Sequence, residues 1–231
     1  MNSESHDIYE KFKIKFNDKR KTLFLCFSIF FAIVFLFLSF FVIFFSPQYW
    51  DVSVSQELQE DQNILLDVVM KALSWLGTVY AASTMVSVWA FIFFIFKYIR
   101  EGIFVLSSLL SGGLSYILKM WIDRPRPSVD FVRIVEEAHY QSFTSGHVLF
   151  YTSFFGTLLI IALFSKILKW KWKILISLSC IAMVTLGAIS RIYLGAHWFT
   201  DVMGGFIVGI LLIMITGSIY LRSKKNSANS F

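Results

Sequence analysis

The stretch TLFLCFSIFFAIVFLFLSFFVIFF, residues 22–45, contains no Asp, Glu, Lys or Arg. A helix that crosses a bilayer needs about 20 mostly apolar residues, so this run is long enough to span one. A basic segment precedes it, as in a secretory signal. The run is nevertheless too long for the apolar core of a cleaved signal, and no small-residue cleavage pattern follows it. We interpret it as a retained transmembrane span.

The same absence of charge recurs along the whole chain. Of its 231 residues, 57% are hydrophobic and only 16% are charged, which is more apolar surface than one soluble core could bury. The charge-free runs are 22–50, 72–96, 102–118, 138–165, 174–190 and 202–221. We predict an all-α fold, a polytopic membrane protein with six transmembrane helices in one bundle.

The segment between the first two runs has a different pattern. Ile64, Leu65, Val68 and Val69 recur there at helical spacing. This spacing predicts an amphipathic helix that lies on the outer membrane surface.

The basic residues predict the orientation of the bundle, because loops rich in Lys and Arg stay in the cytoplasm. With the N-terminus inside, 15 of the 21 Lys and Arg but only 5 of the 15 Asp and Glu fall in inner segments. Both termini are therefore predicted to be cytoplasmic. The expected domains are a lysine-rich lead (1–21), a six-span domain (22–221) and a tail (222–231). Since topology and anionic inner-leaflet lipid explain the net charge of +6, we expect no nucleic-acid binding.

Two predicted outer loops concentrate polar side chains. They are KMWIDRPRPSVDFVRIVEEAHYQSFTSGH, residues 119–147, and SRIYLGAHWFTD, residues 190–201. Four of the six predicted outer basic residues belong to the polar cluster that we select from these loops, namely Lys119, Arg124, Arg126 and Arg191. The positive-inside bias opposes that placement, so an anionic ligand is the simplest compensation. Arg binds phosphate with two hydrogen bonds, and Lys offers a compact charge.

Two histidines accompany these cations. Ser145, Gly146 and His147 begin an apolar run, where free backbone N–H groups and the helix dipole would face an anion. His197 and Asp201 are four residues apart and share one helix face. A carboxylate bonded to one imidazole nitrogen leaves the other free to attack, and a second histidine can act as a general acid. The pattern predicts phosphoryl transfer.

The two loops resemble the three signature motifs of the type 2 phosphatidic acid phosphatase superfamily, K-x6-R-P, P-S-G-H and S-R-x5-H-x3-D. The first and third motifs match at every defined position, in KMWIDRPRP and SRIYLGAHWFTD. The second matches at three of four positions, because Thr144 stands where the family usually has proline. All three keep their order within residues 119–201.

The resemblance implies a role for each matching residue. His197 would be the nucleophile that becomes phosphorylated, Asp201 would orient it, and His147 would protonate the leaving group. The implied phosphate-binding residues are Lys119, Arg126, Ser145, Gly146 and Arg191. No metal and no cofactor are implied. Arg124 lies outside the defined positions and its role stays open, while Thr144 should be tolerated because no charge or proton-transfer group is lost.

The function implied by the resemblance is hydrolysis of a lipid phosphate monoester or diphosphate at the outer face of the cell membrane. Candidate substrates are undecaprenyl diphosphate, phosphatidylglycerol phosphate, phosphatidic acid and a lipid A phosphate. The motifs contact the phosphate, so they do not select among these lipids. Besides the substrate, membrane lipids are the expected partners, and the sequence names no protein partner.

Other functions explain less of the pattern. A non-enzymatic anion or lipid transporter could use the same cationic cluster, but transporters tend to show repeats and broken spans, which we do not expect here. An intramembrane serine protease using Ser145 would leave the cations without a role, and its usual G-x-S-G pattern is absent. A vanadate-dependent haloperoxidase belongs to the same superfamily, but those enzymes are mostly soluble.

Overall fold

The computed structural model describes residues 3–45 and 49–228, and the secondary structure in these ranges is helical throughout. The helices are α1 (Ser3–Phe44), α2 (Tyr49–Leu58), α3 (Ile64–Trp75), α4 (Val79–Ile95), α5 (Ile99–Leu106), the 3-10 turn η1 (Ser107–Leu109), α6 (Leu110–Trp121), α7 (Gly146–Phe164), α8 (Trp170–Tyr193) and α9 (Phe199–Ala228). The predicted all-α class is confirmed. Parts of the predicted lead, first span and tail, at residues 1–2, 46–48 and 229–231, lie outside the described residues.

Within the described part of the chain, five helical segments are long and apolar enough to cross a membrane. They are Lys21–Phe44, Ile99–Trp121, Gly146–Phe164, Trp170–Tyr193 and Phe199–Ser223. Each overlaps one predicted run, and α3 with α4 supplies a sixth if the pair is one bent span. The run 138–165 becomes helical only at Gly146, because its first eight residues belong to the loop that precedes α7.

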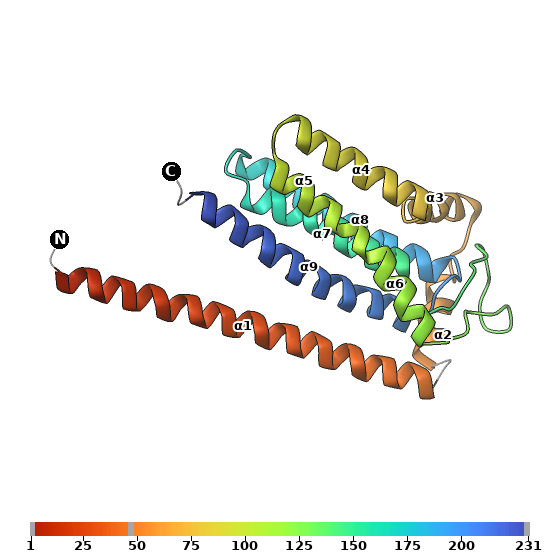
Figure 1. Ribbon diagram of the computed structural model, residues 1–231. Coiled ribbons are helices and arrows are strands. Elements are labelled where there is room, and N and C mark those ends of the chain that lie inside the picture. Colours follow the sequence, from red (N-terminus) through yellow and green to blue (C-terminus); the bar gives the residue numbers. More distant parts are fainter. Residues whose placement is uncertain (1–2, 46–48, 229–231) are drawn as a thin grey trace.

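The predicted run 72–96 is not one straight helix, so our expectation of unbroken spans is wrong here. α3 and α4 meet at a bend of 59°. Thr78 takes extended backbone angles before α4, and its hydroxyl donates to the Trp75 carbonyl at 2.8 Å. The side chain of Asn63 starts α3 by accepting from Leu66 N at 2.9 Å, a typical N-cap. Figure 1 shows α4 continuing along the outside of the bundle after this bend.

The helix predicted from Ile64, Leu65, Val68 and Val69 is α3. These four side chains are 45–84% exposed, so they form an apolar face that the rest of the described chain leaves largely uncovered. An apolar face of this kind fits contact with lipid.

The helices pack as a bundle whose two ends differ. Figure 1 shows both termini at one end, together with the α4–α5 and α7–α8 connections. α2, the α6–α7 loop and the α8–α9 connection lie at the opposite end. Because these connections carry all three motifs, the bundle collects the motif segments at one end, away from both termini.

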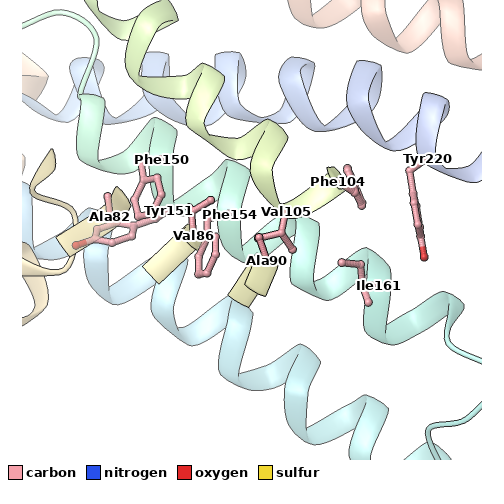
Figure 2. Packing of buried hydrophobic residues seen from close by; sticks show 10 residues of the cluster. All are labelled: Ala82, Val86, Ala90, Phe104, Val105, Phe150, Tyr151, Phe154, Ile161 and Tyr220. Atoms are coloured by element: carbon pink, nitrogen blue, oxygen red, sulfur yellow. The ribbon is translucent and has the colours of Figure 1, made fainter. Parts of the chain in front are cut away.

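The core of the bundle lies around α7, which packs against both α8 and α9. Figure 2 shows ten buried side chains from α4, α5, α7 and α9, namely Ala82, Val86, Ala90, Phe104, Val105, Phe150, Tyr151, Phe154, Ile161 and Tyr220. The rings of Phe104 and Tyr220 stack with centroids 4.6 Å apart, which ties α5 to α9. By contrast, Phe37 on α1 is 71% exposed, as expected for a ring that faces lipid.

Candidate active site

The α6–α7 loop, residues 122–145, is hydrogen-bonded to the α8–α9 connection. The indole N–H of Trp198 donates to the Pro125 carbonyl at 3.1 Å, and Ser145 N donates to the Asp201 carbonyl at 3.0 Å. Gly195 has a positive φ of 68°, and a Cβ there would lie 2.4 Å from the Arg133 carbonyl oxygen. Glycine is suited to both constraints. These contacts bring the segments 119–147 and 190–201 together.

His197 lies buried between an acid and a cation. Its Nδ1 is 3.5 Å from Asp201 Oδ2, and its Nε2 is 3.4 Å from Arg126 Nη1. The first distance is longer than a good hydrogen bond, and among the described residues Nδ1 has no hydrogen-bond partner. The carboxylate of Asp201 is itself fixed, because Oδ2 accepts from Trp198 N at 2.8 Å and from the Ser142 hydroxyl. The Asp201 carboxylate therefore lies beside one ring nitrogen, and the Arg126 guanidinium, a group that can bind phosphate, lies beside the other.

The surroundings keep the His197 ring uncharged. Burial, followed by the positive charges of Arg126, Lys119 and Arg191, holds the pKa of His197 well below its usual 6.5. Burial and the nearby Arg191 lower the pKa of Arg126 to about 10, so Arg126 stays positive near pH 7. A neutral imidazole beside cations has a lone pair available for attack.

Lys119 and Arg126 converge on the same backbone oxygen. Both side chains donate to the Gln141 carbonyl, Arg126 at 3.3 Å. Arg126 also donates to the carbonyl of Tyr140 at 2.7 Å and to that of Ala196. Repulsion between these two half-buried cations is unfavourable, and a bound anion would relieve it.

Arg191 is held by two residues that the sequence analysis did not single out. Its Nη1 lies 2.8 Å from Glu136 Oε1 and also donates to the Ser74 hydroxyl. Ser74 in turn donates to Glu136 Oε2 at 2.8 Å. Ser74 is on α3, so the bent α3–α4 segment contributes to the site. No local pattern marks either residue, because each acts only through tertiary contact.

His147 is enclosed by the bend between α3 and α4. A Cβ on Gly77 would lie 2.4 Å from His147 Cδ2, so the bend touches the ring directly. The ring also meets Tyr151 edge to face, with centroids 6.4 Å apart. The Tyr151 hydroxyl donates to the carbonyl of Leu73 at the end of α3. His147 Nε2 is buried and has no hydrogen-bond partner among the described residues.

Ser145 and Gly146 begin α7, as predicted. The Ser145 hydroxyl is buried, and within the described chain it has no hydrogen-bond partner. The first N–H groups of a helix have no partner in their own helix, so Gly146 adds donors at the same place. A Cβ on Gly146 would lie 2.8 Å from the Ser115 hydroxyl, so glycine permits close packing of α6.

Thr144 directly precedes this helix start. Its side chain is buried, and its hydroxyl finds no partner in the ranges that the structure describes. The peptide bond between Phe143 and Thr144 is cis.

Arg124, whose role the sequence left open, is also part of this end of the bundle. It pairs with Asp201 and with Asp51, an acid on α2 that the sequence analysis did not single out. Asp51 directly follows the first charge-free run, and this position was the only feature of the sequence that could have drawn attention to it.

In chemical terms, the site is a cluster of hydrogen-bond donors beside the neutral imidazole of His197. Among the described residues of the site, the buried side-chain atoms without a hydrogen-bond partner are Thr144 Oγ1, Ser145 Oγ, His147 Nε2, Arg191 Nε and His197 Nδ1. Leaving buried polar atoms unpaired is unfavourable, and an oxyanion with several acceptor oxygens would pair them. The arrangement suits binding of a tetrahedral anion next to His197.

Comparison with known proteins agrees with this chemistry. The model of the PAP2 superfamily matches residues 100–225, a range that contains all three motifs. Phosphatidylglycerophosphatase B of Bacillus subtilis (strain 168) is 30% identical over 166 residues, which cover 67% of this chain and 80% of that protein. A lipid A 4'-phosphatase of Porphyromonas gingivalis is 31% identical over 151 residues, which cover 58% of this chain and 60% of that protein.

Two solved structures share the fold. A crystal structure of a transmembrane PAP2-type phosphatidylglycerolphosphate phosphatase from Bacillus subtilis superimposes with a TM-score of 0.73 and 27% identity. The match covers 84% of this chain and 96% of that one. The crystal structure of Aquifex aeolicus LpxE gives a TM-score of 0.59 at 23% identity over 77% of this chain and 98% of that one, which is a likeness of fold.

Proposed function

This chain belongs to the PAP2 superfamily, and from that premise we propose that it hydrolyses the phosphate of a membrane lipid through a phosphohistidine intermediate. It is a phosphatase with candidate membrane-spanning helices. One observation carries the mechanism. A buried, neutral His197 lies between the Asp201 carboxylate and the Arg126 guanidinium.

In the first step, His197 Nε2 attacks phosphorus and forms the P–N bond, while the bond from phosphorus to the lipid oxygen breaks. Asp201 accepts the hydrogen bond from His197 Nδ1–H and stabilises the positive ring that results. His147, in its protonated form, gives its proton to the leaving oxygen. Its unpartnered Nε2 leaves that nitrogen available for proton transfer.

In the second step, water attacks the phosphohistidine and His147 Nε2 takes a proton from it. The P–N bond breaks, inorganic phosphate leaves, and both rings return to their starting states. Lys119, Arg126 and Arg191 hold the non-bridging oxygens in both steps, with the Ser145 hydroxyl and the Gly146 amide. Catalysis then rests on positioning and charge stabilisation, the main contributions in phosphoryl transfer. We propose that no metal ion takes part.

The proposed substrate class is a lipid phosphate monoester or diphosphate. The names of the two relatives, a phosphatidylglycerophosphatase and a lipid A 4'-phosphatase, favour monoesters. Phosphatidylglycerol phosphate is therefore the first substrate to test, followed by phosphatidic acid, a lipid A phosphate and undecaprenyl diphosphate.

We also propose that the site faces the outside of the cell membrane. Both termini lie at the end opposite the site, so cytoplasmic termini would put the site on the outer face (Figure 1). The charge asymmetry supports cytoplasmic termini. A cysteine placed at Val129, which is 79% exposed in the α6–α7 loop, tests the orientation in right-side-out vesicles. We expect it to react with an impermeant maleimide, and labelling only after permeabilisation would contradict the outer face.

The function is tested by phosphate release from purified protein, with the four lipids side by side and a chelator present. We expect release without added metal. His197→Ala should abolish both this release and the phosphohistidine that forms with labelled substrate, which is detected by separation under alkaline conditions because its P–N bond breaks in acid. His139→Ala is the matched control, because His139 has an exposed side chain in the same loop system. Activity that survives His197→Ala would contradict the mechanism.

The bend between α3 and α4 is one feature that a transporter would share, since transporters often have broken spans. A transporter would move its anion or lipid across a vesicle membrane without releasing phosphate. Transport without release, unaffected by His197→Ala, would therefore favour that alternative over the phosphatase.

A further inference from the structure

Arg124 lies completely buried between two carboxylates from distant parts of the chain. Its side chain is 1% exposed, and those of Asp51 and Asp201 are 0% exposed. Nη2 is 2.5 Å from Asp51 Oδ2, and Nη1 pairs with Asp201 Oδ1. Nη1 also donates to the Thr200 hydroxyl at 2.7 Å. The guanidinium thus links α2 to the first turn of α9.

Asp51 completes the start of α9 from outside that helix. Its Oδ1 accepts from Thr200 N at 2.8 Å, one of the N–H groups that a helix start leaves unpaired. The Thr200 hydroxyl lies 2.9 Å from Asp51 Oδ2 as well. Within α9, Asp201 accepts from Trp198 N at 2.8 Å, which resembles a capping box. Both acids therefore hold the helix turn that carries Asp201.

The two oxygens of Asp201 have separate tasks. Arg124 occupies Oδ1, while Oδ2 receives Trp198 N and the Ser142 hydroxyl and faces His197 Nδ1 at 3.5 Å. Since the guanidinium fixes the carboxylate from the side away from His197, it sets the direction in which Oδ2 points.

Charge gives Arg124 a second effect. A buried carboxylate is costly unless a cation or hydrogen bonds pair it, and Arg124 pairs two of them. The charged and titratable groups that act on Asp201 are Arg124, Asp51, His197, Lys119 and Arg126. Of these, Arg124 is the cation in direct contact with both acids.

We propose that Arg124 is a positioning residue for phosphate release, which keeps the Asp201 carboxylate directed at His197 by bridging it to Asp51. This assignment rests on the proposed function, since it acts through the His197–Asp201 pair. Without the guanidinium, Asp201 Oδ1 loses its partner and the carboxylate is free to turn. Asp201 Oδ2 then no longer faces His197 Nδ1, so the nucleophile loses its orientation.

The first test is Arg124→Gln, assayed for kcat and KM with the best lipid of the panel. We expect kcat at pH 7 to fall by roughly a hundredfold, the scale expected for a misplaced group, while KM changes by less than about threefold. Inhibition by inorganic phosphate should stay within about threefold of wild type, since the three phosphate-binding cations remain.

A compensating variant separates positioning from folding. Asp51→Asn removes the negative charge that repels Asp201 when Arg124 is absent. Arg124→Gln combined with Asp51→Asn should therefore recover at least about tenfold of the lost kcat. Arg124→Lys, which keeps the charge but cannot bridge both acids, should lose about tenfold in kcat. A purely structural role predicts instead that the double variant is worse than either single one.

The matched control is Arg133→Gln in the same loop. Arg133 pairs with Asp67 at 2.6 Å, but its side chain is 41% exposed, so kcat should change by less than about twofold. Arg124→Gln with wild-type kcat, or a double variant no more active than Arg124→Gln, would overturn the assignment of Arg124 alone. If wild-type protein released phosphate from no lipid on the panel, the proposed function and this assignment would both fall.

Discussion

The two histidines of the site are held in different ways. His197 has a carboxylate beside one ring nitrogen and a guanidinium beside the other, at 3.5 and 3.4 Å. His147 has a buried Nε2 with no partner in the described chain, and its ring is confined by the Gly77 backbone and the Tyr151 ring. Charged neighbours on both sides position the first histidine, whereas shape positions the second.

The difference suits the roles that we propose. A nucleophile must present the same nitrogen in every cycle, so a fixed acceptor on Nδ1 is useful. A general acid must give up a proton and take it back, so a permanent partner on its reactive nitrogen would compete with the substrate. The two kinds of support also come from different elements. His197 depends on the ion pairs that Arg124 makes with Asp51 on α2 and Asp201 on α9, whereas His147 depends on the α3–α4 bend.

The largest expected effect separates the two histidines by leaving group. His147→Gln should lower kcat for a lipid phosphate by about a thousandfold, within the range for a lost general acid. With p-nitrophenyl phosphate the loss should be about tenfold, because that phenolate leaves without a proton. His197→Ala should abolish release from both substrates. Equal losses of His147→Gln on the two substrates would contradict a general-acid role.

The next largest effect on kcat is expected for Gly77→Ala, which disturbs the packing that positions His147. The new Cβ would lie 2.4 Å from His147 Cδ2 and 2.8 Å from the Tyr151 hydroxyl, so the ring must move. We expect kcat for a lipid phosphate to fall by about ten- to a hundredfold, with a smaller loss on p-nitrophenyl phosphate. Gly112→Ala on α6 is the control, because nothing lies within 4 Å of a Cβ there. Activity of Gly77→Ala equal to this control would show that the bend does not position His147.

A pH profile sharpens the account of His197. Attack requires the neutral ring, and burial with three nearby cations lowers the pKa of His197 well below 6.5. The rate should therefore persist as the pH falls through 6.5 and decline only near the lowered pKa. Arg126→Gln removes one of those cations, so its acid limb of kcat/KM should move to higher pH although its rate is lower.

The substrate has its own ionisation near pH 6, which also shapes such a profile. Wild type and Arg126→Gln are therefore compared on one substrate, p-nitrophenyl phosphate, from pH 4 to pH 8. An acid limb that stayed in place or moved to lower pH in the variant would refute the electrostatic account.

The smallest expected effect is that of Thr144→Pro, beside the start of α7. In the described chain the Thr144 hydroxyl has no hydrogen-bond partner, so the substitution removes no charge and no side-chain hydrogen bond. We expect kcat to change by less than about threefold. A change of more than about a hundredfold in either direction, or roughly 2.7 kcal/mol of barrier, would contradict the view that this loop tolerates the change.

Sequence and structure contributed different parts of the site. The motif residues His197, Asp201, Lys119 and Arg126 were all predicted, and the structure places them together. Glu136, which pairs with Arg191 across 55 positions, was not predicted. A single carboxylate in a loop carries no local pattern, so only the folded chain reveals which cation it contacts.

The membrane-spanning runs and the family were determined by the sequence itself. A sufficiently long run without charged residues is enough to predict a spanning helix, because the bilayer sets the required length and disfavours charged side chains. Motif spacing was enough to indicate the family, because its members share the same motif residues at the same spacing.

Tertiary structure decided how the two histidines are supported. Arg124 meets Asp51 and Asp201 across 73 and 77 positions of the chain, and the bend at Gly77 meets His147. The energies of a buried charge and of a close contact depend on what lies within a few ångströms. Neighbours at that range come from helices far apart in the sequence, so their pairing is a property of the fold.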